Sequence, residues 1–271
     1  MKMESLFKNI NIQLTNLCNR RCEFCPNSDK NFRSKRYMRK YIFEKIIKNL
    51  GELHFAGRIS PYMNDEPLLE KRLPHMIDFI RYNCPRAYIM INSNGDILNE
   101  ELLLALIISG LNCLTINCYD SIEQFESKVK FISQLSQRHC KFDVHVDGPQ
   151  NEEYLAHPVD YHFVEIRDCS HYSIDSEFLT SRAGNVRNKI PQVRLPIKQY
   201  CPRPFNQMFI NYRGEAAICC EDWDYQAIMG NANIARLEEI WYGVEYEHYR
   251  SFLRKNDRSL PVCCVCDFLE G

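Results

Sequence analysis

Three cysteines lie close together near the start of the chain, in the segment Leu17-Cys18-Asn19-Arg20-Arg21-Cys22-Glu23-Phe24-Cys25-Pro26. Thiolates in one short loop can ligate three irons of a four-iron cubane cluster. The fourth iron would then have no protein ligand, and a free coordination position is what a reactive metal centre needs. A zinc ion completed by a distant residue, or three unrelated thiols, are the alternatives that the spacing leaves open.

A second group of cysteines lies in the last third of the chain. Six of the 14 cysteines follow residue 200, and Cys263 and Cys266 form a Cys-x2-Cys pair. Clustered thiols outside a secreted context indicate metal binding rather than disulfides. A structural zinc ion held by four cysteines would suit such a pair. The five cysteines that are scattered singly (Cys84, Cys113, Cys118, Cys140 and Cys169) are typical of buried small side chains.

The elements that must position these thiols alternate along the first part of the chain. Strand-like runs at 11–14, 53–59, 87–91, 113–117, 142–146 and 162–166 are separated by helical patterns at 41–50, 73–82, 100–109 and 120–135. Asp120 is expected to cap the last of these helices. Strands alternating with helices predict βαβ units and a parallel sheet. Six units are fewer than the eight of a closed barrel, so the sequence predicts an α/β fold with a partial (β/α)6 TIM-like barrel.

The pattern changes near residue 170. The segment 170–198 is polar and irregular, Arg213-Gly214 separates two short strands at 208–212 and 216–218, and helical patterns follow at 237–242 and 246–253. We expect two regions, a barrel over 1–170 and a linker with a small metal-held domain over 171–271. Ligands sit at the carboxyl ends of strands in parallel α/β folds, and Cys18 follows the first strand there.

The first cysteine segment resembles the radical S-adenosylmethionine (SAM) superfamily, whose motif is Cys-x3-Cys-x2-Cys with an aromatic residue before the last cysteine. Cys18, Cys22, Phe24 and Cys25 fit this motif. The resemblance implies a [4Fe–4S] cluster whose open iron binds the amino and carboxylate groups of SAM. It also implies reductive cleavage of SAM to a 5′-deoxyadenosyl radical that abstracts a hydrogen atom from substrate, in a site that the protein orients and shields.

Two further segments fit the superfamily's SAM-binding pattern. Glu66-Pro67 match the end of a Gly-Gly-Glu-Pro motif, which implies that Glu66 faces the amino group of SAM, while Asn64 and Asp65 replace the glycines. Both residue types tolerate left-handed backbone, so the turn can survive the replacement of the glycines. Ser93 and Asn94 resemble the segment that contacts the ribose, although Asn94-Gly95 is also a common turn.

The second cysteine group resembles the SPASM and twitch extensions of the superfamily. The Gly214-x4-Cys219 spacing, Cys201 upstream and the Cys263-x2-Cys266 pair imply one auxiliary [4Fe–4S] cluster held by Cys201, Cys219, Cys263 and Cys266. The chain ends five residues after Cys266, which favours the twitch form. Cys220 and Cys264 adjoin these positions, so an assignment shifted by one residue is the alternative.

Three functions stay open. Shared stretches such as 25–28, 55–60, 66–69, 94–96 and 229–231 resemble the twitch-type dehydrogenases that oxidise aminocyclitols. That resemblance implies two-electron oxidation of a polar small molecule, with the auxiliary cluster taking the second electron. Modification of a ribosomally made peptide is the alternative, although no separate leader-binding domain is recognisable; an epimerase would need a hydrogen-donating thiol, for which Cys118 is a candidate. A non-catalytic protein held by zinc or clusters is the third.

Composition limits the partners. A net charge of −1 gives no overall field for nucleic acid, and the local run Arg33, Lys35, Arg36, Arg39 and Lys40 is typical of a solvated helix face. No apolar run is long enough to span a membrane and the first residues are not a signal peptide, so we expect a cytoplasmic protein. The family resemblance implies an electron donor such as flavodoxin or ferredoxin. Substrate identity and oligomeric state cannot be predicted.

Overall fold

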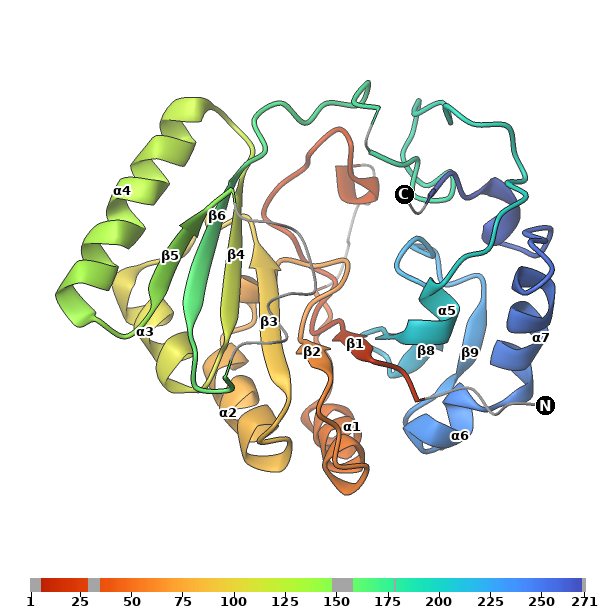
Figure 1. Ribbon diagram of the computed structural model, residues 1–271, viewed down its shortest axis with the longest axis horizontal. Coiled ribbons are helices and arrows are strands. Elements are labelled where there is room, and N and C mark those ends of the chain that lie inside the picture. The colour runs from red at the N-terminus through yellow and green to blue at the C-terminus, as the bar shows by residue number, and fades with distance from the viewer. Residues whose placement is uncertain (1–5, 29–34, 148–157, 178, 270–271) are drawn as a thin grey trace.

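A nine-stranded, mostly parallel sheet forms the centre of the computed structural model (Figure 1). The structure describes residues 6–28, 35–147, 158–177 and 179–269. The strands are β1 Asn9–Ile12, β2 Arg58–Ser60, β3 Tyr88–Ser93, β4 Cys113–Cys118, β5 Asp143–Val146, β6 Phe163–Asp168, β7 Gln207–Ile210, β8 Glu215–Ala217 and β9 Ile228–Asn231. Their order across the sheet is β5-β6-β4-β3-β2-β1-β7-β8-β9. The predicted α/β class is confirmed.

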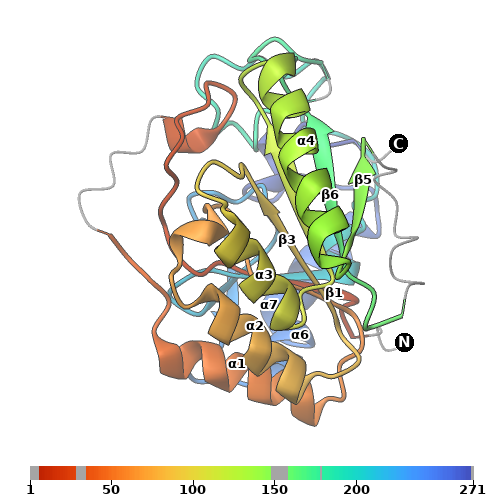
Figure 2. The same cartoon turned by 90° about the vertical axis from the view of Figure 1, so that its left-hand side faces the viewer.

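The helices are α1 Lys40–Glu52, α2 Leu73–Asn83, α3 Glu100–Ile108, α4 Ile122–His139, α5 Arg203–Asn206, α6 Leu237–Trp241 and α7 Val244–Leu253. Figure 2 shows α1 to α4 side by side over one face of the parallel strands. Each buries one stripe; in α1 the buried apolar side chains are Ile42, Phe43, Ile46, Ile47 and Leu50. No helix in the described part of the chain is long and apolar enough to cross a membrane.

The order of strands differs from a simple sequential barrel. β6 lies between β4 and β5, and it pairs in parallel with both. The first four residues of β6 are buried, whereas Asp143 and Val146 at the two ends of β5 are exposed. A strand covered on both faces belongs inside a parallel sheet, and a short strand with exposed ends suits its edge. This is why the fifth predicted strand ends up outermost.

The C-terminal region continues the same sheet. β7 pairs in parallel with β1 over four residues, and β8 and β9 follow in antiparallel order. The predicted hairpin around Arg213-Gly214 is thus present, with Gly214 at a φ of 85° that favours glycine. β9 and the short α5 were not predicted. Because β1 has neighbours on both sides, the segment that leaves it is held between the two regions.

Candidate functional site

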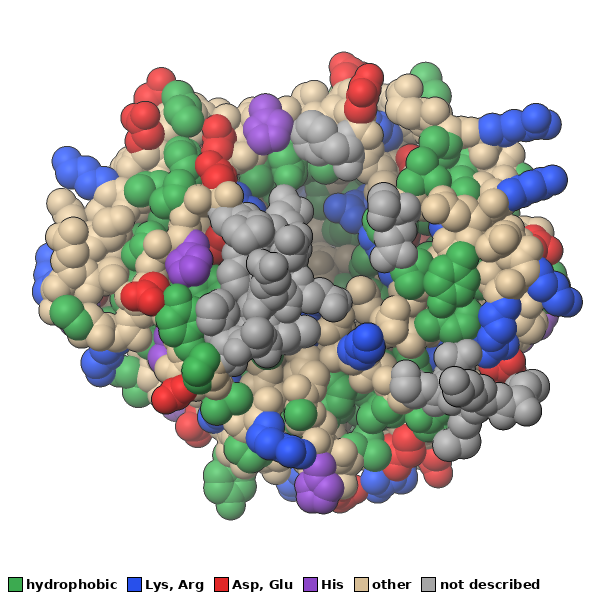
Figure 3. All heavy atoms as spheres, viewed as in Figure 1, with side chains coloured by type: hydrophobic (Ala, Val, Ile, Leu, Met, Phe, Trp, Pro, Cys, Tyr) green, Lys and Arg blue, Asp and Glu red, His purple; other side chains and the backbone are tan. Residues whose placement is uncertain are grey.

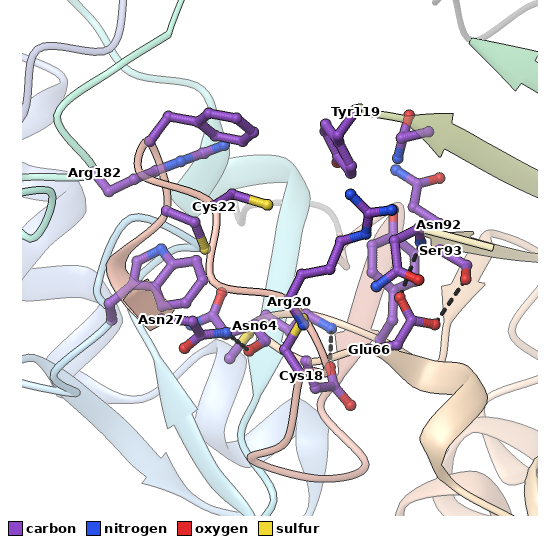
Figure 4. A pocket seen from close by; sticks show the side chains of 18 residues that line it. Cys18, Arg20, Cys22, Asn27, Asn64, Glu66, Asn92, Ser93, Tyr119 and Arg182 are labelled. Atoms are coloured by element: carbon purple, nitrogen blue, oxygen red, sulfur yellow. Dashed lines mark hydrogen bonds between the residues drawn. The ribbon is translucent and has the colours of Figure 1, made fainter. Parts of the chain in front are cut away.

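The first cysteine segment lies at the carboxyl end of β1 and lines a cavity of about 280 Å³. Figure 4 shows Cys18 close to Glu66, with Cys22 further along the same loop; Glu66 comes from the segment after β2, and Ser93 is the last residue of β3. All seven residues predicted for the SAM-binding centre line this one cavity: Cys18, Cys22, Phe24, Cys25, Glu66, Ser93 and Asn94. Their individual roles as iron and SAM ligands stay predictions. The face of the molecule in Figure 3 is hollowed near its centre.

The cysteine segment is held by short-range turns and by one arginine. The Cys25 N–H donates to the Cys22 carbonyl, and the Arg20 N–H donates to Cys18 Sγ at 3.4 Å. The Arg20 guanidinium donates to the carboxylates of Asp96 and Asp120, with N···O distances of 2.6–2.9 Å. Paired guanidinium–carboxylate bonds fix geometry as well as add energy. Arg20 therefore ties the loop after β1 to the loops after β3 and β4.

The predicted cap of the helix after β4 is wrong by one residue. Ser121 is the N-cap of α4, and its hydroxyl accepts a hydrogen bond from the Gln124 N–H. The Asp120 carboxylate binds Arg20 instead, and this contact lowers the pKa of Asp120. Either residue can cap a helix in principle. The sequence could not show that a guanidinium 100 positions earlier competes for the aspartate.

Glu66 is 3% exposed, and its carboxylate has fixed partners. Ser93 Oγ donates to it at 2.7 Å, the Asn94 N–H at 2.9 Å and the Leu68 N–H at 3.0 Å. Burial raises the pKa of Glu66, and these hydrogen bonds lower it in part. A buried carboxylate gains most from a nearby cation, so the site suits an ammonium group. The Ser93 hydroxyl donates its hydrogen bond to Glu66, so Ser93 positions that carboxylate.

The turn before Glu66 forms without left-handed backbone. Asn64 and Asp65 both lack a positive φ. Instead the Asp65 carboxylate accepts hydrogen bonds from the N–H groups of Leu14, Thr15 and Met63. Burial raises the pKa of Asp65 to about 7, against the lowering effect of these bonds. The aspartate that replaces a glycine thus joins the end of β1 to the loop that follows β2.

The walls of the cavity fit a polar ligand beside a cluster. The Asn64 amide nitrogen and the Asn92 amide oxygen line it, are buried and have no hydrogen-bond partner. Such atoms are costly unless a ligand or water satisfies them. Phe24 and Tyr119 also line the cavity, and their rings and that of Tyr172 lie 5.6–6.2 Å apart. Half-buried thiols, unsatisfied amides and nearby aromatic rings fit a cluster with bound SAM.

The second cysteine group also converges. Cys201, Cys219, Cys263 and Cys266 line one small cavity, together with Arg203 and Arg258. Burial raises the pKa of the Cys263 and Cys266 thiols to about 12, so bound metal must displace their protons. The two guanidinium groups would offset the negative charge of a thiolate-ligated cluster. The donor set and its surroundings therefore fit a fully ligated cubane.

The two neighbouring cysteines face elsewhere. Cys220 and Cys264 are absent from the lining of this cavity. The Cys220 sulfur lies 3.1 Å from the Arg203 guanidinium instead. The sequence favoured Cys219 over Cys220 and Cys263 over Cys264. The two favoured side chains are the ones that line the cavity. Their assignment as ligands stays a prediction.

A buried carboxylate joins the two cavities. Glu221 is fully buried, lines the second cavity and pairs with Arg203 at 2.7 Å and Arg182 at 3.1 Å. Arg182 lines the first cavity, and its φ of 52° is left-handed, as are those of Ala183 and Gly184. Strained backbone of this kind persists only where its surroundings hold it. The link of Arg182 to Glu221 was not predicted from the sequence.

Cys118 does not lie where a hydrogen donor would be needed. Its neighbours Asn117 and Tyr119 line the first cavity, whereas Cys118 is 1% exposed and packs in the hydrophobic core. Successive residues of a strand face opposite sides of the sheet, which explains the difference. The structure therefore places Cys118 among the core thiols.

Several lining residues were missed from the sequence. They are Arg20, Asn27, Tyr62, Met63, Asn92, Asn117, Tyr119 and Trp223. Arg20 carried a signal, because it lies inside the cysteine motif. The others lie at strand ends or loops whose side chains face the cavity only through the register of the sheet. Among the described residues, no three His, Cys, Asp or Glu side chains converge on a point that would hold a single metal ion.

Comparisons with known proteins match both halves of this arrangement. Residues 12–121 match the family model described as the radical SAM superfamily, and residues 201–267 match the SPASM iron–sulfur cluster-binding domain. A relative from Niallia circulans, the S-adenosyl-L-methionine-dependent 2-deoxy-scyllo-inosamine dehydrogenase, is 26% identical over 264 residues. The alignment covers 97% of this chain and 93% of the relative.

Solved structures show the same fold. The crystal structure of BtrN in complex with AdoMet and 2-DOIA has a TM-score of 0.75 and 23% identity, covering 98% of this chain and 95% of BtrN. An open conformation of BtrN has a TM-score of 0.67 and 24% identity, and the match covers 98% of this chain and 94% of BtrN. SuiB of Streptococcus suis, bound to precursor peptide SuiA, has a TM-score of 0.63 and 13% identity. The match covers 97% of this chain and 70% of SuiB.

Proposed function

We propose that this chain, which matches the radical SAM superfamily model over residues 12–121 and the SPASM iron–sulfur cluster-binding domain over 201–267, is a radical SAM enzyme that oxidises a polar small molecule such as an aminocyclitol. The dehydrogenase activity named for its relative from Niallia circulans supports this reaction. The observation that carries the proposal is the convergence of Cys18, Cys22, Cys25 and Glu66 on one cavity. Iron–sulfur clusters need a reducing compartment, so we place the protein in the cytoplasm.

The chain's own residues prepare the site. Cys18, Cys22 and Cys25 would hold the first cluster, and Glu66 would accept a hydrogen bond from the amino group of SAM. Phe24 and Tyr119 line the cavity and Tyr172 packs against both rings, so these side chains would limit the access of water. The two clusters would supply the electron that cleaves SAM and accept the electron that leaves the substrate, whose hydrogen atom would pass to the adenosyl group and whose hydroxyl proton would pass to solvent.

The inner face of the parallel strands supports a polar substrate. Asn92, Thr115 and Glu165 are register partners on β3, β4 and β6, so they share the face on which Asn92 lines the cavity. Glu165 is fully buried; one oxygen accepts from Thr115 Oγ1 and Arg167, and the other has no partner. A free buried carboxylate oxygen calls for a donor such as a hydroxyl or ammonium group. We therefore assign substrate binding to this row.

Glu165→Gln should weaken substrate binding without touching the clusters. The amide keeps the size of the side chain but loses the charge, so KM for substrate should rise roughly tenfold, as expected for one polar contact in a buried site. Substrate-independent SAM cleavage and iron content should not change. Glu101→Gln, on the exposed surface of α3, is the matched control. An unchanged KM in Glu165→Gln would remove Glu165 from the substrate site.

The reaction itself is tested with labelled substrate. Reduced protein with SAM and 2-deoxy-scyllo-inosamine, deuterated at the carbinol carbon, should give deuterated 5′-deoxyadenosine and a ketone in equal amounts. Deuterium uptake into unchanged substrate from heavy water would indicate an epimerase instead. SAM cleavage that depends on a peptide and ignores small polyols would favour peptide modification.

A further inference from the structure

A basic groove lies on the outside of the molecule next to the first cysteine segment. Arg36, Arg39 and Arg213 provide its charges, and Tyr37, Tyr41 and Tyr212 provide aromatic sides; it encloses about 480 Å³. Arg36 and Arg39 precede α1, whereas Arg213 comes from the turn between β7 and β8. The sequence indicated only a solvated helix face for the first of these segments; Arg33, part of that run, lies outside the described residues. The fold adds a third arginine from a distant turn.

The groove is rigidly held. The Asn233 amide donates to the Arg213 carbonyl at 2.8 Å, and Lys45 Nζ donates to the Asn233 carbonyl at 2.7 Å. These bonds fix the β7–β8 turn against α1. Two of the cations around the groove are paired, Arg213 with Glu215 and Lys40 with Glu44. Among the described residues the basic side chains of Lys35, Arg36, Arg39, Lys40 and Arg213 outnumber these two carboxylates, although the whole chain has a net charge of −1.

The groove is connected to the first cluster site by hydrogen bonds. Tyr37 pairs with Thr15 in an antiparallel bridge, and the Asn16 N–H donates to the Arg36 carbonyl at 3.1 Å. Thr15 Oγ1 also donates to the Arg36 carbonyl at 2.7 Å. Cys18 follows Asn16 by two residues. The segment that carries Arg36 and Tyr37 is thus hydrogen-bonded to the residues that directly precede Cys18.

We propose that this basic groove is the docking surface for an acidic one-electron carrier protein that reduces the SAM-binding cluster. The inference rests on the proposed function, because only a radical SAM reaction needs that electron. Local positive charge attracts an acidic partner and speeds encounter without requiring a large interface. Exposed tyrosines beside arginines are typical of protein interfaces. Tyr37 is 41% exposed and Tyr41 is 55% exposed, so their rings are available for contact.

The chemistry of the groove favours a protein over a small anion. A small phosphate is normally held by enclosed donors, whereas the cations here are exposed on a wide surface. Electron-carrier complexes are small and transient, and their association rates fall as salt screens the charges. The electron balance is simple: the reduced carrier loses one electron, the cluster gains one, and no bond forms or breaks in this step.

The test compares two reductants on the same holoenzyme variants. Arg36→Glu/Arg39→Glu should lower kcat/KM for a purified flavodoxin, supplied with its reductase and NADPH, by roughly ten- to a hundredfold at low salt. 5′-Deoxyadenosine formation driven by dithionite should stay within about twofold of wild type, because a small reductant needs no docking surface. Lys130→Glu/Lys141→Glu, on the exposed surface of α4 and the residues after it, is the matched control.

Each outcome separates the docking surface from the reaction. An unchanged flavodoxin rate in Arg36→Glu/Arg39→Glu would overturn the proposal, as would an equal loss with dithionite, which would mean damage to the fold or cluster. A similar loss in the Lys130→Glu/Lys141→Glu control would also overturn it, by showing that net charge alone matters. Absence of 5′-deoxyadenosine from wild-type protein with dithionite would contradict the proposed function instead.

Discussion

Cys18→Ala, Cys22→Ala and Cys25→Ala should each abolish the formation of 5′-deoxyadenosine. Each removes one thiol from the cavity in which all three converge. A cubane that keeps only two protein ligands is not retained in a half-exposed loop, so anaerobic protein should fall from about eight to about four irons per chain. Iron analysis and quantification of 5′-deoxyadenosine after dithionite reduction measure both effects.

The matched control is Cys140→Ala, because Cys140 is an exposed thiol outside both cavities. It should keep full iron content and full SAM cleavage. Retention of SAM cleavage in any of the three alanine variants would show that the corresponding thiol is not a cluster ligand.

Cys263→Ala should separate the two clusters. The loss of one of the four thiols that line the second cavity removes about four irons, while the first cluster keeps its three ligands. Reductive cleavage of SAM therefore continues. Oxidation of substrate stops, because no acceptor takes the second electron from the substrate radical. Product analysis beside 5′-deoxyadenosine analysis should show cleavage without ketone.

Cys264→Ala is the control one residue away. Its thiol is absent from the lining of the cavity, so the variant should keep about eight irons and should form ketone. The reverse result, with iron lost in Cys264→Ala and kept in Cys263→Ala, would show that the ligand assignment is shifted by one residue. Loss of both clusters in Cys263→Ala would mean that the second cluster supports the fold of the first site.

The thiols and Glu66 could be found from the sequence because short motifs encode them. Each lies within a few residues of its partners, or directly follows a strand whose end is predictable. Cys263 and Cys266 are separated by two residues, so a single tight turn such as the one at Cys263–Val265 brings their side chains together. Alternating strands and helices were equally local signals.

Interactions that depend on the folded sheet could not be predicted. Arg20 reaches Asp96 and Asp120 only because the loops after β1, β3 and β4 meet at one edge. The position of β6 beside β4 follows from burial on both faces, which a strand of this length does not reveal by pattern alone. The role of Glu165 could not be predicted either, because only the sheet register shows that one of its oxygens binds Thr115 while the other has no partner.

The substitution of Asp65 for glycine shows how a family pattern can mislead. The glycines of the motif drew attention to backbone freedom at 64 and 65, yet the carboxylate of Asp65 accepts three hydrogen bonds that a glycine cannot accept. The side chain thus stabilises the turn by contacts instead of by backbone freedom. Such a replacement can be interpreted only after its partners are known.

The most direct test of the account is the fate of SAM in the presence of the unaltered protein. Anaerobically reconstituted, dithionite-reduced protein should contain about eight irons per chain and convert SAM to 5′-deoxyadenosine and methionine in equal amounts. Stoichiometric zinc with no 5′-deoxyadenosine would contradict it, and Cys18, Cys22 and Cys25 would then be ligands of a structural ion.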